Sequence, residues 1–129
     1  MEFFPQSLDL NLLVSKLYTM PVRVQFCHHL TTSFAAHKAL DGAYDSLNDL
    51  KDSVVEKLIG YSGKRFTQIT IPSQSSYSEN LNLQVAQEII ALGNEIEEFG
   101  DKNGWCDIEN LGQEYSGVGA QLSYLLTLK

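Results

Sequence analysis

The chain has 129 residues, of which 43% are apolar and 19% are charged, so its length and composition suit one folded domain with a packed core. Sixteen Asp and Glu against nine Lys and Arg give a formal net charge of −7, which disfavours a protein held to nucleic acid by bulk charge. No apolar run approaches the roughly 18 residues of a membrane span, so we expect no membrane partner. We therefore treat residues 1–129 as a single domain.

The first predicted helix covers residues 7–30. Residues 1–6 before it lack the positive and apolar regions of a signal peptide, so we expect a cytoplasmic protein. Within the helix, apolar side chains recur at steps of three and four, which is the spacing of one helical stripe. Pro21 interrupts this stripe, and proline removes a backbone donor and clashes with the preceding turn. We therefore expect a kink at Pro21 or a break into two helices.

The second predicted helix covers residues 34–59. A Thr-Thr-Ser run at residues 31–33 precedes it, and these residue types favour the N-terminal cap of a helix. Its apolar positions again step by three and four along the chain. Gly60 and Gly63 supply a stop, because glycine readily adopts the left-handed conformation that ends many helices.

Residues 61–78 have a different character. A short alternating, β-branched stretch is followed by Pro72 and a serine-rich run. A single strand would have no partner here, so we interpret the segment as an extended connection. Its length of about 18 residues is unusual within a compact domain and indicates that it spans a helical bundle from end to end.

Two further helices are predicted after this crossover. Ser78 can cap a helix whose apolar stripe runs from Leu81 to Phe99, and a turn at residues 100–104 ends it. The last helix begins at about Asp107, with apolar positions in a strict 3-4-3-4-3 pattern that is typical of a left-handed bundle seam. Those positions are Ile108, Leu111, Tyr115, Val118, Leu122 and Leu125.

Four amphipathic helices with one long connection predict an all-α fold, a ferritin-like up-down-down-up four-helix bundle with its crossover between helices two and three. Three glycines in the last helix weaken it but permit a neighbouring helix to approach closely. They are Gly112, Gly117 and Gly119.

The cysteines and three of the tyrosines are expected to be core residues. Cys27 and Cys106 form no C-x-x-C pair and are too few for a disulfide framework. Tyr44, Tyr115 and Tyr124 occupy apolar faces, so we expect them in the core rather than in a redox relay.

The candidate ligands concentrate around the start of the second helix, where His28, His29 and His37 lie within ten residues. The sequence has no glycine-rich phosphate loop after a strand, no G-x-S-x-G elbow and no cluster with zinc-finger spacing. It also lacks the E-x-x-H pairs that build a di-iron site inside one bundle, which disfavours a di-metal oxygenase.

The second helix carries a polar stripe beside its apolar face. At about 100° per residue, its four members fall at about 0°, 40°, 60° and 100° around the helix axis. They are His37, Asp41, Asp52 and Glu56. Asp41 and Asp52 are eleven residues apart, which is about 16 Å along the axis at 1.5 Å per residue, so one chain cannot bring both to one ion.

Two chains can complete such a site if the second helix packs antiparallel against its own copy across a two-fold axis. With the crossing centred between residues 46 and 47, His37 and Asp41 of one chain meet Asp52 and Glu56 of the other. An isologous dimer of this kind creates two equivalent sites. Imidazole and carboxylate ligands suit iron, manganese or zinc.

The stretch from His37 to Leu58 is similar to the second helix of the Dps family, the mini-ferritins. That family's pattern is H-x3-D-x10-D-x3-E followed by a basic and an aliphatic residue, and this sequence reproduces each spacing. The resemblance implies a further ligand at the end of the first helix, with His28 preferred and His29 as the alternative. The nine-residue step from His28 to His37 is similar to short, phage-type relatives of the family.

The resemblance implies an iron-binding protein that oxidises Fe(II) with hydrogen peroxide or oxygen, for iron storage and protection against oxidative stress. It implies iron as the metal, with zinc or manganese as substitutes, and a homo-oligomer that is at least a two-fold dimer and at most a twelve-subunit shell. The alternatives are a metal-free ferritin-like interaction module and a DNA-binding Dps-like protein. We expect no direct DNA binding, because the net charge is negative and no lysine-rich tail is present.

Overall fold

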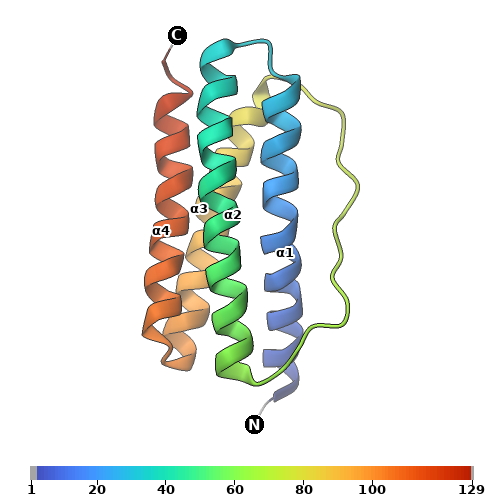
Figure 1. Cartoon of the computed structure of the whole chain (residues 1–129), viewed down its shortest axis with the longest axis vertical. Helices are drawn as coiled ribbons and strands as arrows, with labels where there is room; N and C mark the ends of the chain where they lie inside the picture. The colour runs from blue at the N-terminus through green and yellow to red at the C-terminus, as the bar shows by residue number, and fades with distance from the viewer. Residues whose placement is uncertain (1–2, 129) are drawn as a thin grey trace.

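The computed structural model describes residues 3–128, with side chains from residue 10 onward, and these residues form four α-helices and no strand (Figure 1). The helices are α1 (Phe3–Leu30), α2 (Phe34–Ser62), α3 (Asn80–Asn103) and α4 (Cys106–Leu125). The predicted all-α class is therefore confirmed, while residues 1, 2 and 129 of the predicted domain lie outside the described residues. None of the described helices is long and apolar enough to cross a membrane.

The four helices share one hydrophobic core. In Figure 1, α1 and α4 run in one direction and α2 and α3 run in the other. The main pairings are α3 with α4, α1 with α2, α2 with α4, and α1 with α3, so each helix packs against antiparallel neighbours.

α1 is one helix from Phe3 to Leu30, so of the two alternatives predicted at Pro21, a kink or a break, the break into two helices is wrong. The helix also begins four residues before the predicted start at residue 7. Pro21 is buried, and Leu17 and Val24, which lie on either side of it, are fully buried in the core. Burial of the apolar stripe through this turn offsets the loss of one backbone hydrogen bond.

α2 is capped at both ends largely as predicted. The Ser33 hydroxyl oxygen accepts a hydrogen bond from the backbone N–H of Ala36 at 3.1 Å. Gly63 ends the helix with a φ of 71°, and its N–H donates to the carbonyl of Ile59 at 2.8 Å. The helix continues through Gly60 and ends at Ser62, three residues after the predicted end at residue 59. Gly63, and not Gly60, is the glycine that adopts the left-handed conformation.

The closest helix pairing is the α3–α4 seam. A Cβ added to Gly112 would lie 2.4 Å from the backbone nitrogen of Glu97, and one added to Gly119 would lie 2.7 Å from the carbonyl oxygen of Ala86. Both positions require glycine because any side chain would push the two helices apart. Gly117, by contrast, has no described atom within 4 Å of an added Cβ, so only two of the three predicted glycines serve close approach.

Residues 63–79 form the crossover, without helix or strand, and carry the chain along α1 from the end of α2 to the start of α3 (Figure 1). Phe66, Ile69 and Tyr77 pack against the core. The predicted extended connection is confirmed. The predicted Ser78 cap is wrong, because Glu79 occupies the cap position of α3 and makes no capping hydrogen bond with its side chain.

The expectations for cysteine and tyrosine burial hold in part. Cys27 and Tyr115 are fully buried, and Tyr44 is half-buried. Cys106 is exposed and Tyr124 is 58% exposed, so both were wrongly expected in the core. They lie in the first and last turns of α4.

Candidate metal centre

A pair of histidines joins the end of α1 to the start of α2. The Nδ1 atom of His28 lies 3.0 Å from the carbonyl oxygen of His37, and the Nδ1 atom of His37 lies 3.0 Å from the carbonyl oxygen of His28. The two rings stack with their centroids 4.1 Å apart and an interplanar angle of 17°. Each histidine therefore holds the other in place through its own backbone.

This reciprocal pairing fixes the tautomer of both rings. A carbonyl oxygen can only accept a hydrogen bond, so Nδ1 must be the donor in His28 and in His37. In the neutral rings, the lone pair that can bind a metal is then on Nε2. Histidines that bind metals commonly donate their other N–H to a carbonyl in this way, because the bond orients the ring.

Asp41 lies one helical turn after His37 and completes this end of the site. Its Oδ1 atom is 3.8 Å from the Nε2 atom of His28. The His28 side chain is 15% exposed and the Asp41 side chain is 54% exposed, so the carboxylate is open to solvent while the ring is mostly covered. The structure thus places His28 in contact with His37 and within 3.8 Å of Asp41.

His29, the alternative ligand, is exposed at the same end of α1. Its ring lies 5.1 Å from the His28 ring, centroid to centroid, with an interplanar angle of 49°. Among the described residues it makes none of the backbone hydrogen bonds that orient His28 and His37.

Asp52 and Glu56 lie farther along α2 and are exposed. Neither forms a hydrogen bond or ion pair with any residue that the structure describes. Within the described part of the chain, no group of three His, Cys, Asp or Glu side chains is placed to hold a metal ion. One chain therefore leaves the two ends of the predicted site apart.

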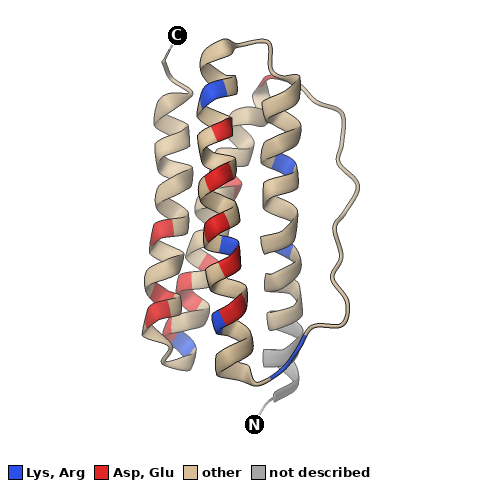
Figure 2. Cartoon of the chain, viewed as in Figure 1, with Lys and Arg blue, Asp and Glu red and all other residues tan. Residues whose placement is uncertain are grey.

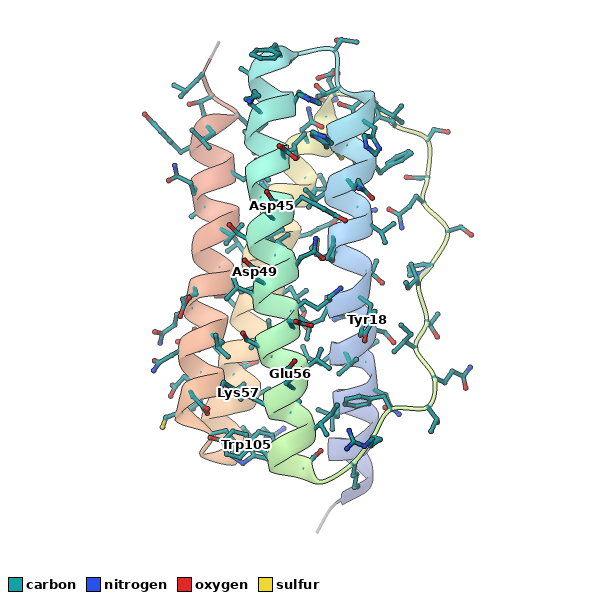
Figure 3. All side chains as sticks on the ribbon, in the orientation of Figure 1. Tyr18, Asp45, Asp49, Glu56, Lys57 and Trp105 are labelled. Carbon is teal, nitrogen blue, oxygen red and sulfur yellow. The ribbon has the colours of Figure 1, made fainter. Side chains whose placement is uncertain are left out.

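Asp45 and Asp49 belong to the same surface, although the sequence reasoning did not single them out. They fall at about 80° and 120° on the helix scale used above, so Asp45 lies inside the polar stripe and Asp49 lies about 20° beyond its edge. Both are exposed, and Figure 2 shows the acidic positions following one another along α2, with Asp45, Asp49 and Glu56 labelled in Figure 3. The four-residue steps from Asp41 were the signal that could have found them. We call the five carboxylates the acidic face of α2: Asp41, Asp45, Asp49, Asp52 and Glu56.

Glu79, at the start of α3, forms hydrogen bonds with the turn that joins α1 to α2, between His28 and His37. The Glu79 carboxylate accepts hydrogen bonds from the Thr32 backbone N–H at 3.0 Å and from the Thr31 hydroxyl at 2.9 Å. The bond from Thr32, followed by that from Thr31, lowers the pKa of Glu79. An ionised Glu79 thereby fixes the short connection between His28 and His37.

Cys27 directly precedes the histidine pair but is placed as a core residue. It is fully buried, and this burial raises the pKa of its thiol to about 11. A thiol with so high a pKa is neutral near pH 7 and is a poor ligand or nucleophile. The candidate site is therefore built from imidazole and carboxylate groups.

Comparison with known proteins places the chain in one family. Residues 28–126 match DUF5856, a family of unknown function. The chain belongs to this family. The matched region begins at His28 and includes every predicted ligand.

A protein of Enterobacteria phage T4, described as an uncharacterized 14.6 kDa protein in the mobD-ri intergenic region, is similar to this chain. The two are 31% identical over 102 residues, which cover 79% of this chain and 75% of the phage protein. No solved structure matches the chain.

Proposed function

We propose that this protein is a mini-ferritin of the Dps type, with a ferritin-like fold, that binds and oxidises Fe(II) at sites shared between two-fold-related subunits. The observation that carries the proposal is the reciprocal pairing of His28 and His37, which orients both rings and leaves the Nε2 lone pair of His28 beside the Asp41 carboxylate. Orientation of this kind is what a metal-binding histidine needs before the metal arrives.

The arrangement of the helices supports the ferritin-like part of the proposal. α2 and α3 run parallel, and the crossover spans the length of the bundle between them (Figure 1). α1 packs against α2 and α3, and α4 packs against the same two helices. This is the up-down-down-up order of a bundle with one long crossover.

The acidic face supports the two-fold arrangement. An antiparallel crossing of α2 with its copy, centred between residues 46 and 47, pairs residues whose numbers add to 93. His37 then faces Glu56, and Asp41 faces Asp52, of the second chain. The same register sets Phe34, which is 76% exposed, opposite Ile59 of the second chain. Apolar contacts at both ends would thus flank the ligands.

The donor set suits iron that is delivered as substrate. Carboxylates and neutral imidazoles bind Fe(II) without the thiolates that favour zinc, and they leave coordination positions open. Two Fe(II) ions give two electrons to one hydrogen peroxide, which takes up two protons and leaves as two waters. Because the two sites of a dimer lie roughly 16 Å apart along the helix, both electrons would reach the same peroxide only from two Fe(II) ions held at one site, and this two-electron reduction would avoid hydroxyl radical. Oxidised iron would collect in a closed shell of twelve subunits.

The test is anaerobic titration with Fe(II), followed by hydrogen peroxide, with the mass measured by light scattering on the same sample. We expect saturation near two sites per dimer, rapid oxidation, and a mass of a dimer or a twelve-subunit shell. Absence of Fe(II) binding together with a monomeric mass would contradict the proposal and would leave a metal-free interaction module.

A matched pair of double variants assigns the ligands. Asp52→Ala/Glu56→Ala removes two carboxylates of the acidic face and should abolish rapid oxidation. Glu98→Ala/Asp101→Ala removes the same charge from exposed positions on α3 and should oxidise Fe(II) at the parent rate. Equal rates in the two double variants would refute the assignment of the site.

A further inference from the structure

A cavity of about 720 Å³ lies between α1, α3 and the crossover, away from the histidines. The crossover, which runs along α1 (Figure 1), covers one side of this cavity, and α1 and α3 line the other sides. The described crossover residues form no helix that would fill the space. Its volume is in the range of sites that bind small molecules.

The floor of the cavity is apolar. Met20 from α1 and Leu92 from α3 are buried beneath it, and Leu12, which is 57% exposed, lies at its edge. Pro72 of the crossover forms part of the opposite wall, and Ala91 of α3 lines the opening. An apolar molecule placed there would be in contact with hydrocarbon of the floor and with the Pro72 ring on the side of the crossover.

Two ion pairs bridge α1 and α3 across the cavity. Lys16 Nζ lies 2.8 Å from Glu95 Oε1, and Arg23 holds Glu88 with contacts of 2.6 and 2.9 Å. The pairs are seven residues apart on each helix, which is about 10 Å. Each charge in the lining is matched by its partner, so the cavity has no excess charge with which to attract an ion.

The crossover wall is held by few polar contacts. The Thr70 N–H donates to the Ser15 hydroxyl at 3.0 Å, and Arg23 donates to the Gln74 side chain at 2.8 Å. A wall without its own secondary structure can adjust to a guest without breaking a helix.

We infer that this cavity binds an uncharged apolar molecule about 10 Å long. The paired charges favour a neutral guest over an anionic or cationic one, and the spacing of the two ion pairs sets its length. The inference does not depend on the proposed iron chemistry, because none of the lining residues belongs to the histidine pair or to the acidic face of α2.

The test uses N-phenyl-1-naphthylamine, an uncharged dye that fluoresces when it leaves water. We expect saturable binding with one dye per chain, and binding at least tenfold weaker for its sulfonated analogue, anilinonaphthalene sulfonate. Ala91→Trp fills the opening of the cavity and should weaken binding of the neutral dye at least tenfold. The control Ala120→Trp changes an exposed alanine on α4 and should bind the dye like the parent.

Circular dichroism and thermal unfolding show whether both tryptophan variants are folded. Equal dye binding by folded Ala91→Trp and Ala120→Trp would overturn the inference, as would binding that never saturates. A dye signal that falls as the chain self-associates would assign the groove to a second copy and would overturn it as well. Asp52→Ala/Glu56→Ala should bind the dye normally, which separates this site from the proposed iron site.

Discussion

The α3–α4 seam and the acidic face of α2 are both regular helix surfaces, but they are constrained in opposite ways. In the seam, glycine is required because the backbones of two helices nearly touch. On the acidic face, five carboxylates are exposed, and within the described chain only that of Asp41 lies near another helix, at 3.8 Å from His28. Packing inside one subunit accounts for the glycines of the seam, whereas it does not account for the carboxylates of the acidic face. Changes in the seam should therefore affect folding, and changes on the face should affect association and metal binding.

The largest expected effect is in the seam. Gly112→Ala places a Cβ 2.4 Å from the backbone nitrogen of Glu97, so α3 and α4 must separate. We expect a loss of about 3 kcal/mol in the free energy of unfolding, measured by urea denaturation. Gly117→Ala is the control on the same helix, where an added Cβ meets no described atom within 4 Å. Gly117→Ala should gain roughly 0.5–1 kcal/mol in the free energy of unfolding. Similar values for the two variants would contradict the close approach of α3 and α4 at Gly112.

The acidic face should respond in association rather than in folding. In the two-fold register, Asp45 of one chain lies close to Asp49 of the other, so like charges oppose each other near the axis. Asp45→Asn/Asp49→Asn should strengthen metal-free dimerisation about fivefold at low salt, measured by sedimentation equilibrium. The difference should shrink at high salt because ions screen exposed charges.

The stability of the monomer should change by less than about 0.5 kcal/mol in that double variant. A dimer that is weakened or unchanged by Asp45→Asn/Asp49→Asn at low salt would argue against contact through this face.

A smaller effect is expected in the centre of the bundle. Tyr115 is fully buried and its hydroxyl has no hydrogen-bond partner among the described residues. Tyr115→Phe removes this unpaired group and should raise stability by roughly 0–1 kcal/mol. Tyr77→Phe is the matched control, because the Tyr77 hydroxyl donates to Asn82 at 2.9 Å. It should cost about 1 kcal/mol in the same urea titration. A clear loss of stability in Tyr115→Phe would show that the hydroxyl has a partner.

The smallest effect concerns pH. Because hydrogen bonds from Thr32 and Thr31 lower the pKa of Glu79 below its ordinary value of 4.5, its ionised form favours the folded state. That contribution is complete above pH 4.5 and is lost as the pH falls through the lowered value. Glu79→Gln should be less stable than the parent at pH 7 and should approach it in acid, by thermal unfolding. A gap that persists unchanged in acid would exclude the linkage.

The sequence predicts the fold well because local signals agree with it. The capping serine before α2 and the apolar periods each define an element that the structure contains. The errors arise where tertiary contacts outweigh local preference. Pro21 lies inside α1 between buried residues, and Glu79 occupies the cap position of α3 while its side chain binds the turn between α1 and α2.

The candidate site was predictable only in part for a similar reason. Spacing along one helix identified His37 and Asp41, but the reciprocal bonds between His28 and His37 depend on how two helices meet. No periodic signal in either helix encodes that contact. The partner expected for Asp52 and Glu56 lies in a second chain, so it remains a prediction.

The crossover joins two halves that are each a complete helical hairpin, α1 with α2 and α3 with α4. A nick within residues 67–76 would remove no helical turn, and it would cost the loop-closure entropy of the tether together with any contacts of Ile69, Thr70 and Gln74 that it loosens. The hairpins would then associate as two molecules, so stability would depend on their concentration. All predicted metal ligands lie on the first hairpin, whereas Glu79, which binds the turn between α1 and α2, belongs to the second. The chain is therefore suited to complementation, in which the second fragment would restore order to the histidine turn of the first.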